Sequence, residues 1–98
     1  MSKVLETSSI LKRSEAQVSC NLDGEVAILH LTKSRYFGLA GVGAHIWLAL
    51  EQPRSVEELC ESITRDFDVA PVTCRTDVLT FLASLQEAGL VEVTAGPA

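Results

Sequence analysis

Three cysteines and two histidines are the residues of this 98-residue chain that could do chemistry. A thiolate becomes a strong nucleophile beside a base, so Cys20, Cys60 or Cys74 with His30 or His45 would make a cysteine-type catalytic pair. Each cysteine, however, stands at an apolar position of a predicted strand or helix, where a thiol usually packs as a small hydrophobic group. We therefore predict no catalytic residue and expect that this chain is not an enzyme.

No arrangement of these residues fits a metal or a phosphate group. The cysteines are far apart, without a Cys-x-x-Cys pair or a Cys/His ligand spacing, so a zinc site is not expected. Gly38, Gly41 and Gly43 lack the Lys and Ser/Thr of a phosphate-binding loop. We predict neither a metal nor a cofactor. Scattered cysteines in odd number are typical of free thiols in a reducing compartment, which predicts a cytoplasmic protein.

Length and composition indicate a single globular domain. The chain is 47% hydrophobic and 21% charged, ordinary values for a folded domain. Its formal net charge is −5 and its eight basic residues are scattered, so a nucleic-acid surface is not expected. No apolar run approaches the ~18 residues of a membrane span, and the N-terminal MSKVLETSS lacks the apolar segment of a signal peptide.

The chain divides into three predicted parts. Residues 1–15 show no clear period and are expected to form a flexible arm, with one extended stretch around Ile10 and Leu11. Residues 16–94 carry the regular pattern of a folded domain, and residues 95–98 are expected to be a disordered tail. The elements that position a functional site must therefore come from residues 16–94.

A β-hairpin opens the predicted domain. Val18, Cys20 and Leu22 alternate with polar residues, as in a half-buried strand. Asp23-Gly24 follows, and this pair favours a two-residue type I′ turn because both positions need a positive φ. The sequence therefore predicts that two antiparallel strands meet at this turn.

A third strand is predicted to leave an open sheet edge. Residues 25–31 have bulky side chains on both faces, which favours a central strand, and residues 35–39 form the next strand after a turn. In such a meander the last strand lies at an edge, unless the N-terminal arm covers it. Its backbone N–H and C=O groups would then be available to another strand.

Three helices are predicted after the sheet. Pro53 is expected to end the first, Ser55 and Glu58 form a capping box at the start of the second, and Pro71 and Gly89 suit the two ends of the third. A last short strand is predicted over residues 91–93. Three strands followed by three helices make a compact α+β platform.

The third helix carries more apolar surface than one packed side requires. One stripe consists of Cys74, Val78, Phe81, Leu82 and Leu85, and Val72, Leu79 and Ala83 widen it. A helix packed on one side needs an apolar arc of only ~100°. Two interpretations stay open: burial on two sides, or one flank that lines a groove. A groove beside a free strand edge would bind a peptide by β-strand addition.

Three segments together resemble the PqqD-like family. They are DGEVAILHLTKSRYFGLAGVGAHIW, PRSVEELCESITRDFDV and DVLTFLASLQEAGLVEV, and the similarity runs from about Val18 to Val93. The family consists of recognition elements that bind the leader segment of ribosomally made precursor peptides. The Y-F-G-L and V-G-A-x-I-W pieces look closest to the stand-alone leader-binding proteins of lasso-peptide clusters. Ala40 and Ala70 depart from the family pattern and weaken helix capping.

The resemblance implies a winged-helix-like fold and a site. The leader would add as a fourth strand along the third strand, in a cleft against the third helix, with Arg75 at its rim. Tyr36 and Phe37 point to opposite faces, so one is expected in the core and the other nearer the groove. The implied peptide-binding residues are Ser34, Arg35, Tyr36, Phe37, Gly38, Leu39, Cys74, Arg75, Val78, Phe81, Leu82 and Leu85.

The resemblance also implies a function without catalysis. The protein, a monomer or weak homodimer, would present a precursor's leader to a separate maturation enzyme, a leader peptidase of the cysteine-protease type. No nucleic acid or membrane is expected as a partner. Alternatives are a peptide chaperone in PQQ biosynthesis and a winged-helix structural or DNA-binding subunit, although the acidic charge disfavours DNA.

Overall fold

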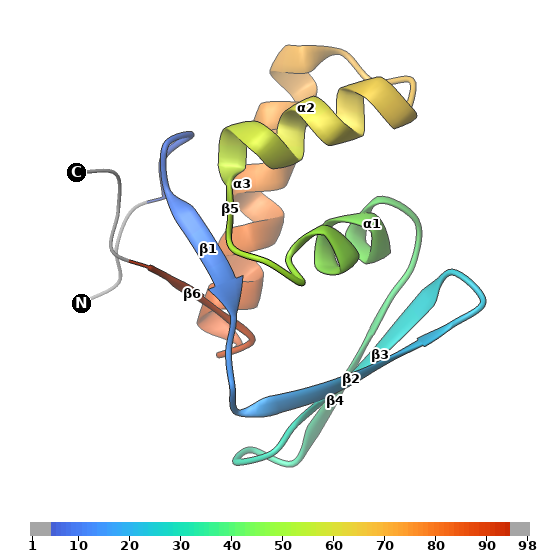
Figure 1. The fold of residues 1–98 in the computed structure, drawn as a ribbon, viewed down its shortest axis with the longest axis vertical. Helices are drawn as coiled ribbons and strands as arrows, with labels where there is room; N and C mark the ends of the chain where they lie inside the picture. The colour runs from blue at the N-terminus through green and yellow to red at the C-terminus, as the bar shows by residue number, and fades with distance from the viewer. Residues whose placement is uncertain (1–4, 95–98) are drawn as a thin grey trace.

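The computed structural model describes residues 5–94, which form two small antiparallel sheets and three helices (Figure 1). The elements are β1 (Ile10–Arg13), β2 (Gln17–Leu22), β3 (Glu25–His30), β4 (Arg35–Leu39), α1 (Gly41–Ala49), β5 (Arg54–Ser55), α2 (Val56–Asp66), α3 (Pro71–Glu87) and β6 (Val91–Val93). The expected α+β class is confirmed and is compatible with a winged-helix-like arrangement. None of the helices within these residues is long and apolar enough to cross a bilayer.

The predicted meander is present as the sheet β2–β3–β4. Asp23 and Gly24 have φ values of 52° and 82°, as the type I′ turn between β2 and β3 requires. The register places Ile28 opposite Phe37, with β3 in the centre. Val26 and Ile28 are buried on the face that α1 and α3 cover. The central position of the second strand is therefore confirmed.

Strand β2 differs from its prediction. Its apolar residues Val18, Cys20 and Leu22 are exposed, because they pair with residues of β3 that point away from the helices. Tyr36 lies on the same outer face. The alternation in β2 thus identified residues that share a face, but that face is not covered within residues 5–94.

The prediction of a flexible N-terminal arm is also corrected. Ile10–Arg13 forms β1, the central strand of a second sheet that was not predicted, between β5 and β6. Leu11 is completely buried, and the Arg13 guanidinium lies 4.7 Å from the centre of the Trp47 ring. These contacts hold the expected extended stretch against the core. Residues 1–4 of the arm and the expected tail, 95–98, lie outside the described residues.

The helices begin and end largely as predicted. Ser55 and Glu58 form the capping box of α2, and α1 ends at Ala49, before Pro53. At the end of α3, Gly89 has φ 79° and its N–H donates to Gln86 O, while the next N–H donates to Leu85 O. This pair of bonds is a Schellman motif. Ala40 and Ala70 supply no side-chain cap, as their sequence implied.

A single core joins the two sheets to the helices. Its fully buried members of largest volume include Trp47, Leu11 and Ile28. Figure 1 shows α1 between the β2–β3–β4 sheet and α2, with α3 running behind. The face of α3 that carries Cys74, Val78, Leu82 and Leu85 is buried. This arrangement positions the C-terminal end of β4 between α1 and α3.

Candidate functional site

Strand β4 has a free edge. Among residues 5–94 it pairs with β3 alone. The Leu31 N–H donates to Ala16 O at 2.9 Å, so odd-numbered residues of β3 direct their backbone groups to β2 and even-numbered ones to β4. Phe37, opposite Ile28, therefore uses its N–H within the ladder, whereas Tyr36 and Gly38 direct theirs to the free edge.

An apolar groove begins where β4 ends. Its volume is about 440 Å³. Its walls are formed by the end of β4, the start of α1, α2 with the following turn, and α3 from Cys74 to Phe81. The lining residues are Gly38, Leu39, Ala40, Val42, Gly43, Ile46, Ile63, Val69, Cys74, Asp77, Val78 and Phe81. The groove can therefore receive an apolar side chain from an extended segment that lies along β4.

Gly43 limits the width of this groove. A Cβ atom at this position would lie 3.2 Å from Phe81 Cζ and 3.8 Å from Leu39 Cδ2. The first distance is shorter than most real Cβ contacts, so any side chain here would push the ring or fill the space beside it. The absence of a side chain at Gly43 lets the Phe81 ring pack directly against α1 at the groove wall.

The structure divides the predicted site residues among four places. Gly38, Leu39, Cys74, Val78 and Phe81 line the groove. Ser34 to Phe37 do not line it; they lie in the turn before β4 and along the strand that leads to it. Leu82 and Leu85 belong to the buried core. Arg75 faces a separate pocket between α2 and α3.

The two aromatic residues of β4 have different surroundings. Phe37 is half-buried against the core, with the Arg35 guanidinium 5.5 Å from its ring centre. Tyr36 is 78% exposed on the outer face of the sheet. The core position therefore belongs to Phe37, while Tyr36 contributes backbone groups to the edge and does not line the groove.

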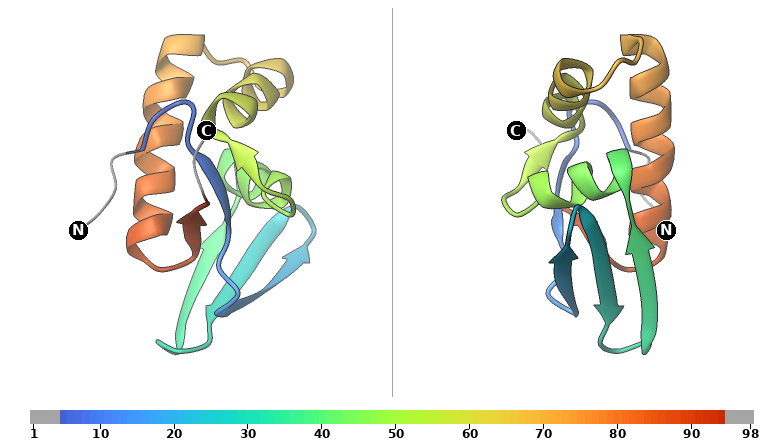
Figure 2. Two further views of the ribbon diagram at one scale, coloured as in Figure 1. Left: turned by 60° about the vertical axis from the view of Figure 1, so that its left-hand side comes forward. Right: turned by 90° about the vertical axis from the view of Figure 1, so that its right-hand side faces the viewer.

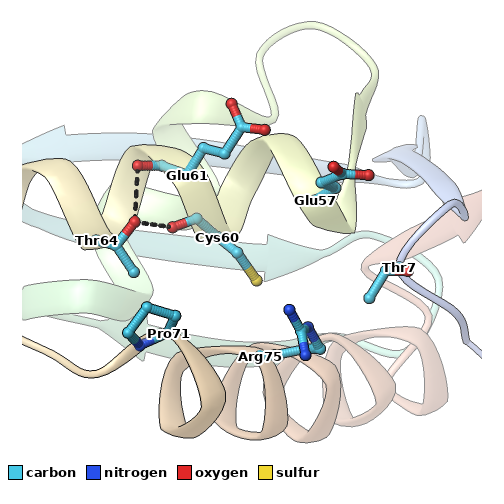
Figure 3. Close-up of a pocket in the computed structure, with 7 residues that line it drawn as sticks. All are labelled: Thr7, Glu57, Cys60, Glu61, Thr64, Pro71 and Arg75. Atoms are coloured by element: carbon cyan, nitrogen blue, oxygen red, sulfur yellow. Dashed lines mark hydrogen bonds between the residues drawn. The ribbon is translucent and has the colours of Figure 1, made fainter.

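Arg75 faces a different pocket, between α2 and α3 (Figure 3). Arg75 follows Cys74 directly on the helix, and this rotation points its side chain away from the groove. Arg75 therefore does not form the expected rim. The pocket has a volume of about 560 Å³, and its lining residues are Thr7, Glu57, Cys60, Glu61, Thr64, Pro71 and Arg75. Its lining is more polar than that of the groove and includes no residue of β4, which makes it a weaker site for an apolar peptide.

The comparisons with known proteins agree with this geometry. A family model described as coenzyme PQQ synthesis protein D (PqqD) matches residues 25–91. The chain belongs to the PqqD family. Among curated proteins, none matches this sequence.

Two solved structures show the same family fold. One, TbiB1 in complex with the TbiA(beta) leader peptide, is 39% identical, has a TM-score of 0.81, and is matched over 86% of this chain and 98% of that one. The other is a lasso peptide synthetase B1 complexed with the leader peptide; it is 16% identical with a TM-score of 0.70, over 84% and 96% of the two chains. The second likeness shows the fold alone. The predicted resemblance to PqqD-like recognition elements is confirmed.

Sequence reasoning missed part of the groove of this PqqD-family protein. The missed residues of α1 and its N-cap are Ala40, Val42, Gly43 and Ile46. Ile63 of α2, Val69 of the α2–α3 turn and Asp77 of α3 were missed as well. No sequence signal distinguished Val42 from a core residue, because its 39% exposure is seen only in the structure. Asp77 is an acidic residue with no local signal for a groove, and only the packing shows that it borders one.

The thiols and imidazoles do not form the catalytic pairs considered from the sequence. No hydrogen bond within residues 5–94 joins a cysteine to a histidine. Burial raises the pKa of Cys60 to about 11, with a further contribution from the adjacent Cys74, so its thiol is protonated at neutral pH. His45 Nε2 lies 2.8 Å from Ser62 Oγ and 3.8 Å from Asp66 Oδ2.

These contacts of His45 do not form a proton relay. A relay needs the two ring nitrogens to face different partners, whereas here one nitrogen meets both. Within the described residues, no group of three potential ligands could hold a metal ion. The groove and its strand edge are therefore the site whose chemistry this PqqD-family structure supports.

Proposed function

We propose that this protein binds the leader segment of a ribosomally synthesised precursor peptide by strand addition to β4. The observation that carries this proposal is a free strand edge that leads directly into an apolar groove. Backbone groups of Tyr36 and Gly38 pair with the leader. An apolar leader side chain then enters the groove beside Phe81.

The relatives support this assignment. TbiB1 is 39% identical over nearly its whole length and was solved with a leader peptide. The present chain has a free strand edge and an apolar groove, which suit an extended peptide. Of the residues proposed from the sequence, Ser34 to Leu39 supply the strand edge, and Cys74, Val78 and Phe81 supply the groove wall.

The magnitudes are adequate for a useful affinity. Each net backbone hydrogen bond contributes roughly 0.5–1.5 kcal/mol, and one fully buried large apolar side chain contributes about 1.5–3 kcal/mol. Several such bonds and two or three anchors offset the ordering cost of an extended peptide. The expected dissociation constant lies in the nanomolar to low-micromolar range, or about 8–12 kcal/mol.

The protein contributes no bond chemistry in this proposal. Residues 16–94 act as the recognition domain and present the precursor to a separate maturation enzyme, a leader peptidase of the cysteine-protease type. Holding the leader beside that enzyme raises the effective concentration of the cleavage site. The protein acts in the cytoplasm, where its three free thiols stay reduced.

A matched pair of variants tests the groove. Val42 and Leu48 are both on α1 and are 39% and 41% exposed, but only Val42 lines the groove. Fluorescence anisotropy would follow binding of a labelled TbiA(beta) leader peptide and of leaders from short reading frames beside this gene. We expect Val42→Gln to weaken binding about tenfold, because it removes about 1.4 kcal/mol of apolar contact.

Leu48→Gln should leave the affinity unchanged, and circular dichroism should show both variants folded. Equal losses in the two variants would contradict the groove as the binding site. Failure of the wild-type protein to bind any of these peptides would contradict leader binding itself.

The family description supports one alternative, a peptide chaperone in PQQ synthesis. That protein would use the same edge and groove with a different peptide. A titration with the PQQ precursor peptide, run beside the lasso-type leaders, separates the two functions by which peptide binds more tightly. The 39% identity to TbiB1 favours the lasso-type leader.

A further inference from the structure

Asp77 places a single charge in an otherwise apolar groove. Of the described residues that line the groove, it alone is charged at neutral pH. Its carboxylate makes no hydrogen bond or ion pair with the rest of residues 5–94. The basic side chain nearest in sequence, Arg75, faces the pocket between α2 and α3. A ligand in the groove therefore meets an unpaired negative charge beside an apolar wall.

The spacing on α3 matches the repeat of an extended peptide. Asp77 and Phe81 are four residues apart on one helical face, which is about 6 Å along the helix axis. A strand advances about 6.6 Å between side chains that point to the same side. In both views of Figure 2, the axes of β4 (green) and α3 (orange) are nearly parallel, with the two chain directions opposed. A peptide that continues from the edge of β4 therefore runs along α3.

We propose that Asp77 selects leaders that carry Lys or Arg two residues from the apolar residue seated against Phe81. This inference rests on the proposed function of leader binding. Asp77 is exposed, so we expect the modest attraction of a surface ion pair. The protein's net charge of −5 adds to the preference for a cation. The preferred leader thus contains an apolar residue, then any one residue, and then Lys or Arg, in either direction along the chain.

The test uses the TbiA(beta) leader peptide as a frame. Each position in turn carries Lys in one peptide and Gln in another, and anisotropy gives the ratio of their dissociation constants. For the wild-type protein we expect Lys to bind about three- to fivefold more tightly than Gln at one or two positions. At 0.5 M salt this ratio should fall towards one, because screening weakens an exposed pair.

Two substitutions of Asp77 separate charge from hydrogen bonding. Asp77→Asn keeps an acceptor oxygen but removes the charge, so the Lys preference should disappear while the apolar contacts persist. Asp77→Lys should make Lys the weaker partner at the same positions. Glu87→Gln is the control, because it changes the net charge equally on the same helix but does not line the groove.

Each outcome has a defined meaning. Loss of the Lys preference in Asp77→Asn, with its retention in Glu87→Gln, supports the proposal. A preference that survives in Asp77→Asn, or that is absent in the wild type, overturns it while leader binding stands. If no peptide of the set binds to the wild-type protein, the proposed function fails, and this inference fails with it.

Discussion

The two edges of the β2–β3–β4 sheet differ in what lies beside them. Both β2 and β4 direct alternate backbone groups away from β3, without a further strand among residues 5–94. Strand β4 ends at a groove of about 440 Å³ between α1 and α3. Strand β2 is exposed along nearly its whole length, and its residues do not line that groove.

This difference indicates that a free edge alone does not define a recognition site. Backbone pairing provides affinity for almost any extended segment, whereas side-chain pockets provide selectivity. On β2, the side chains that face the helix side of the sheet are polar, among them Ser19 and Asn21. On β4, the neighbouring helices supply the pocket. The comparison therefore predicts that changes to the two edges have unequal effects.

The largest effect should come from the buried side of α3, which supports the groove. Leu82→Ala removes a side chain with no exposed surface, and we expect it to lower the free energy of unfolding by about 2–5 kcal/mol. Urea denaturation measures this change. Leu48→Ala, at a 41% exposed position, should cost less than about 1 kcal/mol. A small loss of unfolding free energy in Leu82→Ala would indicate that this side chain lies in the groove rather than in the core.

The next effect tests the two edges directly. Tyr36→Pro removes a backbone donor that faces the free edge of β4, and Ser19→Pro removes the equivalent donor of β2. Proline is tolerated at such edge positions. We expect Tyr36→Pro to weaken leader binding about tenfold, because one hydrogen bond is lost and the ring obstructs the added strand. Ser19→Pro should have little effect.

The side chain of Tyr36 requires its own control. Tyr36→Ala keeps the backbone donor, so its affinity should stay near that of the wild type. If Ser19→Pro were the more damaging substitution, the peptide would lie on β2 and the assignment of the edges would be reversed.

Local signals in the sequence predicted most of the elements. The Asp23-Gly24 turn, the capping box at Ser55 and the Gly89 stop each depend on residues close together in the chain. Such features are set by backbone conformation and near-neighbour hydrogen bonds. For the same reason the order of strands and helices was predictable, and with it the free edge of the third strand.

The misplaced features depend on distant contacts. Alternation in β2 showed that Val18, Cys20 and Leu22 share a face, but no local pattern tells which face the helices cover. The pairing of the extended stretch at β1 was missed because its partners, β5 and β6, lie about 40 and 80 residues away in the chain. The groove combines residues of four elements, so the sequence predicted its α3 wall and missed the wall formed by α1.

A smaller effect concerns the width of the groove. Gly43→Ala places a methyl group 3.2 Å from Phe81 Cζ, so the partly buried ring must shift by a few tenths of an ångström. We expect binding to weaken several-fold, as measured by anisotropy. The thermal midpoint should hold or rise, because Ala is a better helix former than Gly by about 1 kcal/mol. Leu48→Ala is the control, since Leu48 is on the same helix but does not line the groove.

The smallest effect concerns Cys60, in the pocket between α2 and α3. Burial raises the pKa of its thiol from 9.0 to about 11, so folding favours the protonated form. The resulting stabilisation is fully present below pH 9 and is lost as the pH rises towards 11. Urea denaturation should therefore show a steeper loss of stability over this range in the wild type than in Cys60→Ala, while leader binding at pH 7 is the same in both. A change in affinity at pH 7 would mean that this pocket contributes to the peptide site, and the groove beside β4 would no longer account for selectivity alone.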